Sequence, residues 1–319
     1  MKSIKHVFPF FILILTLSII GFIPNLYYLH LFNLILIYSI FSLGLNILTG
    51  YTGITSFGHA GFFALGAYAT AILSTRYGVP PILSIFFASF LTAIAGFIIG
   101  LPVIRISGIY LAMVTLGSAE FIRLLALNWD SLTGGAIGIS NIPALSILGC
   151  YFKSESSLFF FLYAMLIIST FIFVRITNSR FGKSLIAIKD DEQAAESIGI
   201  PCAKNKLISF FISGFYSGLS GALYAHFDRF IHPATFTFSL SVLVLCMVIL
   251  GGMGTVFGSI LGAIVIVILL EYLQPLGVYR LFVYGMILTI MISYFPQGLI
   301  GILKEVSGHF RKNKFKNTI

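Results

Sequence analysis

Two ionisable side chains stand three residues apart inside an apolar run. Glu120 and Arg123 have the spacing that lets side chains pair along one helix face. Charged groups within a bilayer are costly, so they normally face a cavity or an oppositely charged partner. The pair therefore predicts either an ion pair that fixes a helix bundle or a contact to a polar solute, and the structural role is the commoner one.

The segment 49–61 combines polar residues with four glycines between two apolar runs. This composition disfavours a continuous helix, because glycine is a weak helix former. At membrane depth, irregular backbone is tolerated only where protein or a water-filled cavity satisfies its polar groups. A broken helix there also presents free N–H groups, which suit an anion such as an α-carboxylate. The segment predicts either a broken helix beside a solute pathway or a tight turn between spans.

If this segment lines a pathway, its small and polar residues contribute to it, with Glu120 in support. His59 taken alone is more often a packed, hydrogen-bonded residue than a ligand or a proton relay. The candidate pathway residues are Gly53, Ser56, Phe57, Gly58, His59, Gly61 and Glu120.

Motifs that could indicate catalysis fail on their spacing. Gly182-Lys-Ser184 has the ending of a phosphate-binding loop, but Thr177 occupies the position of that loop's first glycine. The sequence contains neither HExxH nor GxSxG. We therefore predict no enzymatic activity, no cofactor and no metal site. The three cysteines form no CxxC pair, which argues against a disulfide framework or a zinc site; they are Cys150, Cys202 and Cys246.

The composition identifies the elements that must position these residues. Of 319 residues, 58% are hydrophobic and 9% are charged, and the mean hydropathy is +1.04. A soluble domain has about a quarter charged residues, so this chain is expected to be an all-α, polytopic membrane protein. The net charge of +9 comes from basic residues between and after apolar runs, which favours the positive-inside bias and anionic lipid over nucleic acid.

The apolar residues fall into about ten segments of a length that suits membrane helices. Several are shorter than the ~20 residues of a straight span, so some are expected to be broken or re-entrant. Whether the third segment crosses or re-enters stays open. The first has no cleavage site after it and is expected to remain as an uncleaved span. The segments are 7–23, 29–49, 54–75, 82–103, 108–127, 156–175, 206–227, 239–253, 258–273 and 280–295.

Lys and Arg counting predicts the orientation. With the N-terminus inside and the segments alternating, 14 of the 19 basic residues fall on the cytoplasmic side. Both termini are then cytoplasmic. We expect one transmembrane domain over 1–303, with a cytoplasmic loop at 176–205 and a basic tail at 304–319.

The loop at 176–205 is the one sizeable polar segment on the cytoplasmic side. Gly182 and Gly199-Ile-Pro201 bracket a run of helix formers, which predicts one or two short surface helices. Asp190-Asp-Glu192 forms an acidic turn between them.

Glycines four residues apart predict close packing of apolar helices. Such small-residue faces let helix backbones approach in lipid, and this role is commoner than a direct ligand role. The glycines are Gly254, Gly258 and Gly262, with Gly96/Gly100 and Gly214/Gly218 as further pairs.

Several short motifs follow one another in a fixed order over residues 30–302. They are Gly44–Gly50, Ser56–Gly61, Gly108–Gly117, Thr133–Gly135, Asp190–Gly199, Gly221–His226, Gly251–Gly254 and Pro296–Leu299. Together they resemble the permease subunits of branched-chain amino acid ABC importers, and most closely the M-type member of the two permeases in such systems.

The resemblance implies a multi-pass protein of the bacterial inner membrane that works with other chains. These are a second homologous permease, two cytoplasmic ATPase subunits and a periplasmic or lipid-anchored substrate-binding protein, with lipid but no nucleic acid as a further partner. Family permeases carry a Glu-Ala-Ala-x-x-x-Gly element that docks on the ATPase. Here Gln193 replaces the glutamate of that element. The implied coupling residues are Asp190, Asp191, Glu192, Gln193, Ala194, Ala195 and Gly199.

The expected function is that of a membrane permease subunit for branched-chain and other hydrophobic amino acids, with ATP hydrolysis on partner chains. A permease of the same family for urea or short amides remains an alternative, because the apolar lining does not specify the solute. An ion-coupled secondary transporter is a second alternative. That class usually has internal repeats and intramembrane acids, and here no repeat is found and only Glu120 and Glu271 are candidate acids.

Overall fold

The computed structural model describes residues 25–104, 106, 108–147, 150–152, 154–279, 282, 283, 285, 286, 289 and 298–301. The expected first span at 7–23, most of the expected last span at 280–295 and the basic tail at 304–319 lie outside these residues. So do Arg105, Lys153 and Arg280, which entered the charge count.

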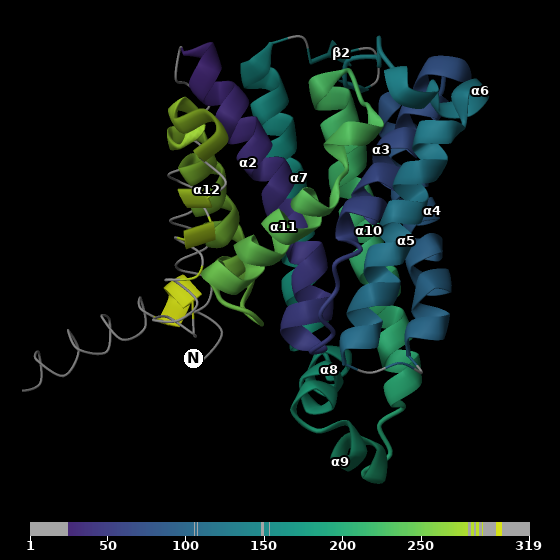
Figure 1. Cartoon of the computed structure of the whole chain (residues 1–319), viewed down its shortest axis with the longest axis vertical. Coiled ribbons are helices and arrows are strands. Elements are labelled where there is room, and N and C mark those ends of the chain that lie inside the picture. Colours follow the sequence, from purple (N-terminus) through teal and green to yellow (C-terminus); the bar gives the residue numbers. More distant parts are fainter. Residues whose placement is uncertain are drawn as a thin grey trace, which may run out of the picture.

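The described residues form a bundle of helices (Figure 1), six of which are long and apolar enough to cross a membrane. These six are α2 (Leu26–Leu45) with its continuation η1 (Asn46–Tyr51), α4 (Pro81–Val103), α5 (Ile109–Asn128), α7 (Glu155–Asn178), α10 (Cys202–Asp228), and α11 (Phe238–Gly251) with the preceding turn η3 (Pro233–Thr235).

Two more of the expected apolar segments are helical but are not among the six. α3 (His59–Arg76) is richer in small and polar residues, and α12 (Val256–Tyr272) is shorter. The predicted helical membrane bundle is therefore confirmed in its class. The predicted number of about ten spans is not confirmed by the described residues.

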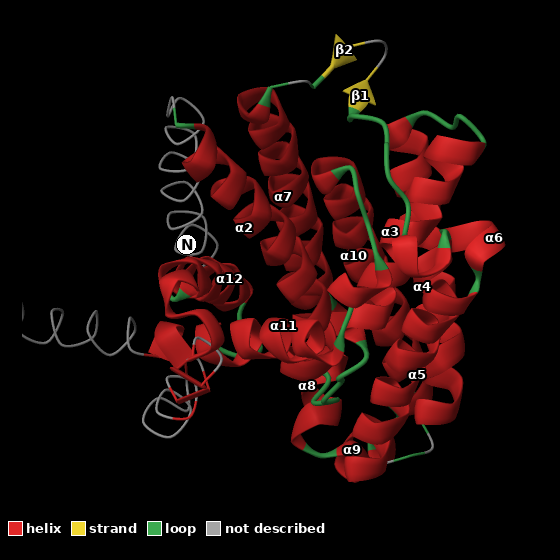
Figure 2. Cartoon of the chain, turned by 45° about the horizontal axis from the view of Figure 1, so that its top comes forward, coloured by secondary structure: helices red, strands yellow, loops and turns green. Residues whose placement is uncertain are grey.

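Short elements occupy the two ends of the bundle (Figure 2). One end has α8 (Arg180–Asp190) and α9 (Glu192–Ser197). The other end has a two-stranded antiparallel hairpin with Ser146 opposite Tyr151, which the all-α prediction did not include. The remaining short elements are α6 (Asp130–Thr133), η2 (Gly135–Ile137), β1 (Ser146–Ile147), β2 (Cys150–Tyr151) and η4 (Gln274–Tyr279).

α10 packs against α2, α3 and α4 through very close backbone contacts. A Cβ atom built on Gly66 of α3 would lie 2.6 Å from the Cα atom of Gly218, and one on Gly96 of α4 would lie 2.7 Å from the carbonyl oxygen of Phe210. Real Cβ atoms do not approach so closely, so glycine is required where these helices cross.

The glycines of the α11–α12 region have two different environments. A Cβ atom on Gly258 would lie 2.7 Å from the carbonyl oxygen of Gly251, and one on Gly262 would lie 3.1 Å from the Gly251 nitrogen. Gly254 lies in the turn before α12, where its φ of +74° falls in the left-handed region that favours glycine. The turn faces Gly50 of η1.

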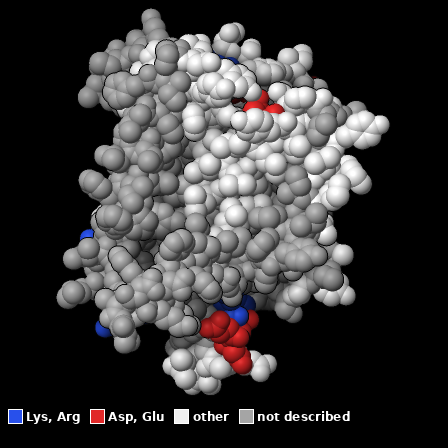
Figure 3. Space-filling model, turned by 90° about the vertical axis from the view of Figure 1, so that its left-hand side faces the viewer, with Lys and Arg blue, Asp and Glu red and all other residues white. Residues whose placement is uncertain are grey.

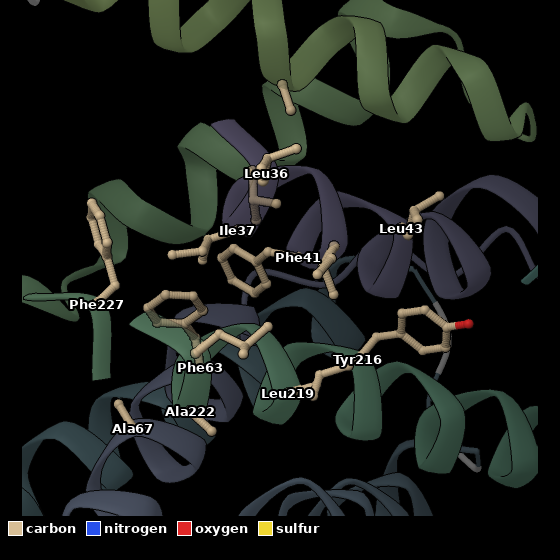
Figure 4. Packing of buried hydrophobic residues seen from close by; sticks show 14 of the residues in the cluster. Leu36, Ile37, Phe41, Leu43, Phe63, Ala67, Tyr216, Leu219, Ala222 and Phe227 are labelled. Carbon is tan, nitrogen blue, oxygen red and sulfur yellow. The ribbon is translucent and has the colours of Figure 1, made fainter. Parts of the chain in front are cut away.

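The apolar core lies where α2, α3 and α10 meet (Figure 4). Phe41 of α2 and Phe63 of α3 pack with their ring centroids 4.7 Å apart, and both are almost fully buried. By contrast, α4 exposes a row of large apolar side chains, which fits a surface covered by lipid or by another protein. They are Leu83, Phe86, Phe87, Phe90, Leu91 and Ile98.

The helix crossing at Gly66 supports a direct test. Gly66→Ala should lower the thermal unfolding midpoint of the chain in detergent, because overpacking a tight interior costs about 1–3 kcal/mol. Gly117→Ala in α5 is the matched control, since a Cβ atom there meets no atom within 4 Å. An alanine at Gly117 should leave the midpoint unchanged or raise it. Equal midpoints for the Gly66→Ala chain and the unmodified chain would contradict the close crossing.

Candidate functional site

The segment predicted to be a broken helix or a tight turn joins two helices through an irregular stretch, and residues 46–58 are called the broken segment below. α2 ends at Leu45 and continues as the π-helix η1, after which residues 52–58 run in irregular conformation to the start of α3. Figure 1 shows this stretch passing from the α8 end of the bundle back along the helices to α3. Gly53 has a φ of +78°, so the chain turns at a residue that suits glycine.

Hydrogen bonds within the segment satisfy its irregular backbone. The N–H of Ile54 donates to the carbonyl oxygen of Leu48 at 3.0 Å, and the N–H of Thr52 donates to that of Ile47 at 3.1 Å. Two hydroxyl groups add to this, with Thr49 Oγ1 donating to the Ile54 carbonyl at 3.0 Å and Thr52 Oγ1 to the Ile47 carbonyl at 2.9 Å. The threonines of the motif therefore hold a non-α-helical backbone in place.

Asn46 joins η1 to the turn between α11 and α12. Its Nδ2 donates to the carbonyl oxygen of Thr255 at 2.9 Å, and its Oδ1 accepts from the N–H of Gly254 at 2.9 Å. Its side chain is fully buried. One amide side chain thus satisfies two backbone groups of a loop more than 200 residues away in sequence.

His59 is fully buried at the start of α3. Its Nδ1 lies 3.0 Å from Ser56 Oγ, and its Nε2 lies 2.7 Å from Ser213 Oγ. Ser213 Oγ donates its proton to the carbonyl oxygen of Gly44 at 2.7 Å, so it accepts from Nε2–H, and Nδ1 accepts from the Ser56 hydroxyl. A neutral imidazole therefore has both nitrogens satisfied, as expected for a packed histidine.

Gly58 and Gly61 lie against α5. A Cβ atom on Gly58 would be 2.6 Å from the carbonyl oxygen of Thr115, and one on Gly61 would be 2.6 Å from Ala119 Cα. The N–H of Phe57 donates to Thr115 Oγ1 at 3.2 Å. The small residues of the motif thus bring the start of α3 into contact with α5.

An open cavity of about 520 Å³ lies between the broken segment, α5 and the α8–α9 end. This volume is within the ~300–1,000 Å³ of small-molecule sites. Of the candidate pathway residues, Gly53 and Phe57 line the cavity, whereas Ser56 and His59 are buried. The lining residues are Thr52, Gly53, Ile54, Thr55, Phe57, Ile106, Gly108, Leu111, Ala112, Ile188, Lys189, Glu192 and Lys206.

Glu120 and Arg123 form the ion pair that their spacing predicts. Arg123 Nε lies 3.0 Å from Glu120 Oε1 and 2.9 Å from Oε2, and its Nη2 also contacts Oε1. The Glu120 side chain is 44% exposed, and α5 is the least buried of the six membrane-length helices. The pair therefore lies along one helix rather than between helices, so its predicted role in fixing the bundle stays a prediction, as does a contact from Glu120 to a solute.

The loop at 176–205 contains the short surface helices that its glycines and proline predict. The Ser179 hydroxyl accepts from the N–H of Gly182 at 3.3 Å and caps α8. The Asp191 carboxylate accepts from the N–H of Ala194 at 3.0 Å and caps α9. Gly199 has a φ of +86°, which explains why glycine ends the motif.

α9 presents an acidic face and is held by a small apolar core. Ala195 is 2% exposed and packs with Ile188 and Cys202, and a Lys206–Glu192 ion pair joins α9 to α10. Figure 3 shows acidic side chains, with basic ones beside them, at this end of the molecule. Of the predicted coupling residues, Ala195 is buried and the others are exposed: Asp190, Asp191, Glu192, Gln193, Ala194 and Gly199.

Sequence reasoning missed three residues that organise this region. Asn46 and Ser213 are polar residues buried in apolar spans, and this pattern could have marked them as interhelical hydrogen-bonding groups. Lys189 lies in the last turn of α8, where a basic residue commonly meets helix carbonyls. Its Nζ donates to the carbonyl oxygen of Gly50 at 2.8 Å.

Asn46→Ala should destabilise the chain markedly. The substitution leaves the N–H of Gly254 without the partner described above, at about 1–3 kcal/mol for an unsatisfied group, whereas the Thr255 carbonyl still accepts from the N–H of Ser259 at 3.4 Å. Titration with sodium dodecyl sulfate in mixed micelles measures the unfolding free energy. Asn128→Ala is the control, because its exposed amide donates to Leu124 within the same helix. A loss no greater than that of the control would refute the role of Asn46.

Comparison with known proteins places these features in a family. The family model described as the permease component of the branched-chain amino acid transport system matches residues 27–292. The high-affinity branched-chain amino acid transport system permease protein LivM of Escherichia coli K12 is 36% identical over 291 residues, which cover 84% of this chain and 68% of that protein. No solved structure matches the chain.

Two further relatives show how far the similarity extends. The probable branched-chain amino acid transport permease protein LivM of Methanocaldococcus jannaschii is 26% identical over 314 residues, covering 83% of this chain and 90% of its own length. The autoinducer 2 import system permease protein LsrC of Yersinia pseudotuberculosis is 30% identical over 202 residues, covering 61% and 55%. With the six membrane-length helices, these findings confirm a multi-pass membrane transport protein, and the chain belongs to the branched-chain amino acid transport permease family.

Proposed function

We propose that this chain is the membrane-spanning permease subunit of an ATP-binding-cassette importer for branched-chain and other hydrophobic amino acids in a bacterial inner membrane. The observation that carries the proposal is 36% identity over 84% of the chain to a permease of a branched-chain amino acid transport system. ATP hydrolysis takes place on two partner ATPase subunits. A second homologous permease completes the pore, and a periplasmic or lipid-anchored binding protein delivers the solute.

The end that bears α8 and α9 faces the cytoplasm in this proposal, and both termini lie on the same side. Six basic residues lie between Arg175 and Lys206 at this end. Arg76 ends α3 and Arg229 follows α10 at the opposite end. Positive residues concentrate on the cytoplasmic side of membrane proteins. The alternation of about ten segments also belongs to this proposal.

The exposed face of α9 is the surface that docks on the ATPase. Ile198 follows α9 and is 75% exposed, two residues after the exposed Glu196. An exposed apolar side chain next to charged residues is suited to a specific interface. Because Ala195 packs into a small core and Lys206 pairs with Glu192, a force on this face moves α9 as part of a rigid unit.

The solute pathway runs along α5 and the broken segment. α5 leaves the Glu120–Arg123 pair partly exposed in an apolar helix, and such a pair needs protein or water beside it rather than lipid. We assign the cover to the second permease. Gly53 and Phe57 then contact the pathway, and four buried residues position the segment: Ser56, Gly58, His59 and Gly61.

A urea or short-amide permease is the second candidate. This candidate is supported by the similarity to a relative named as an autoinducer 2 import permease, because related permeases are then named for more than one kind of solute. The apolar residues on α5 and the broken segment favour a solute with a hydrophobic side chain.

Ile198→Ser tests the docking surface. Loss of the exposed apolar anchor should abolish or strongly reduce recovery of the ATPase subunits with an affinity-tagged permease, because central apolar anchors carry about 2 kcal/mol or more of binding energy. Ile137→Ser at the other end of the bundle is the matched control, since Ile137 is 82% exposed. Unchanged ATPase recovery with Ile198→Ser would refute the docking assignment, and no ATPase with the unmodified chain would refute the proposed function. Loss of ATPase recovery with Ile198→Ser would also place α9 on the cytoplasmic side of the membrane, because ATP is hydrolysed in the cytoplasm.

Uptake competition distinguishes the two solutes. Cells that express the complete operon should take up radiolabelled leucine, and excess isoleucine or valine should compete while excess urea should not. The physical reason is that burying an aliphatic side chain gives about 1.5–3 kcal/mol that urea cannot supply. The control is the same strain with the permease gene deleted. Saturable urea uptake that leucine does not inhibit would establish the second candidate.

A further inference from the structure

The helices α8 and α9 (residues 180–197) are called the α8–α9 hairpin. Lys189 joins this hairpin to the broken segment. Its Nζ donates to the carbonyl oxygen of Gly50, the next-to-last residue of η1, at 2.8 Å. The final carbonyls of a helix lack partners within the helix and carry the negative end of its dipole. A positive ammonium group is therefore a favourable partner for this end of η1, and a hydrogen bond with a charged donor is stronger than a neutral one.

The same lysine also packs against the broken segment. A Cβ atom built on Gly53 would lie 3.0 Å from Lys189 Cγ and 3.4 Å from Lys189 Cβ. Gly53 thus leaves room for the lysine stem as well as adopting its left-handed conformation. Two independent contacts, one polar and one steric, hold α8 against residues 50–53.

η1 is also fixed to the α11–α12 turn. A Cβ atom on Gly50 would lie 2.5 Å from the Gly254 nitrogen, and Asn46 binds Gly254 and Thr255 as described above. The α8–α9 hairpin has a second connection, through the Lys206–Glu192 ion pair to α10. Lys189 and Glu192 both line the open cavity together with Gly53 and Phe57.

We propose that Lys189 is a positioning residue that transmits displacement of the α8–α9 hairpin to residues 50–57 of the broken segment. This inference rests on the proposed function, because the displacing force comes from the ATPase docked on α9. The Lys206–Glu192 pair connects the hairpin to α10, which the glycine crossings hold in the core. The Lys189–Gly50 bond connects it to the wall of the cavity, so movement of α8 changes the cavity lining.

Lys189→Met tests the inference, since methionine keeps an unbranched apolar stem and removes the ammonium group. In the purified permease–ATPase complex with its binding protein, leucine uptake per ATP hydrolysed should fall by about fivefold or more, a loss typical of coupling between sites. ATPase recovery with the tagged permease should not change. Lys183→Met in the same helix is the matched control, because Lys183 and Lys189 are both exposed, and Lys189→Arg should retain coupling because it keeps a charged donor.

A second measurement does not depend on assembly with partners. Ile54 is 5% exposed and lines the cavity, so an Ile54→Cys residue reacts with a membrane-impermeant maleimide only when the segment opens. In inside-out vesicles, with the native cysteines replaced by alanine, Lys189→Met should raise the labelling rate of Ile54→Cys by about fivefold or more. Lys183→Met should leave that rate unchanged.

The outcomes separate this inference from the proposed function. Normal uptake per ATP and normal labelling in the Lys189→Met chain would overturn the role of Lys189 and leave the proposed function standing. Equal defects in Lys183→Met, or a Lys189→Arg chain as defective as Lys189→Met, would also overturn it. An unmodified chain that recovers no ATPase refutes the proposed function, and the vesicle labelling still decides whether Lys189 holds the segment.

Discussion

Every backbone polar group inside a bilayer must find a partner in the protein, and the broken segment after α2 depends on this constraint. A regular helix meets the requirement automatically, but residues 46–58 do not form one. Two threonine hydroxyls and the Lys189 ammonium donate to carbonyl groups of this segment, and the Asn46 amide satisfies backbone groups of the α11–α12 turn. The polar residues of an otherwise apolar region are therefore explained by the backbone that they satisfy.

The same segment connects the parts of the molecule that the proposed transport cycle must coordinate. It contacts α5 through Gly58, with Gly61 of α3 beside it, and it contacts the α11–α12 turn through Asn46. Its third contact is with α8, which together with α9 forms the acidic end of the bundle (Figure 3). In the proposed cycle, a displacement of α8 and α9 reaches the cavity wall through the Lys189–Gly50 bond, without passing through the apolar core.

Much of the fold follows from local features of the sequence. Apolar segments predicted most of the described helices, the glycines and proline at 182–201 predicted α8 and α9, and the spacing of Glu120 and Arg123 predicted their ion pair. The count of about ten spans is not confirmed, because α3 is richer in polar residues than the six membrane-length helices and α12 is shorter than they are. The Asn46–Gly254 and Lys189–Gly50 bonds join residues 208 and 139 positions apart. Such contacts depend on how distant segments pack, and no local pattern specifies them.

The glycine crossings of α10 have a mechanical consequence. Where two helices usually meet, a layer of side chains between them can change rotamer and let one helix slide over the other. At Gly66 and Gly96 that layer is missing and backbone lies directly on backbone. α3, α4 and α10 consequently form a rigid frame, because at these crossings no layer of side chains allows one helix to slide over another. Because Gly58 and Gly61 bring backbone directly onto α5 in the same way, the opening and closing of the proposed passage are expected to involve motion of the α11–α12 unit relative to this frame.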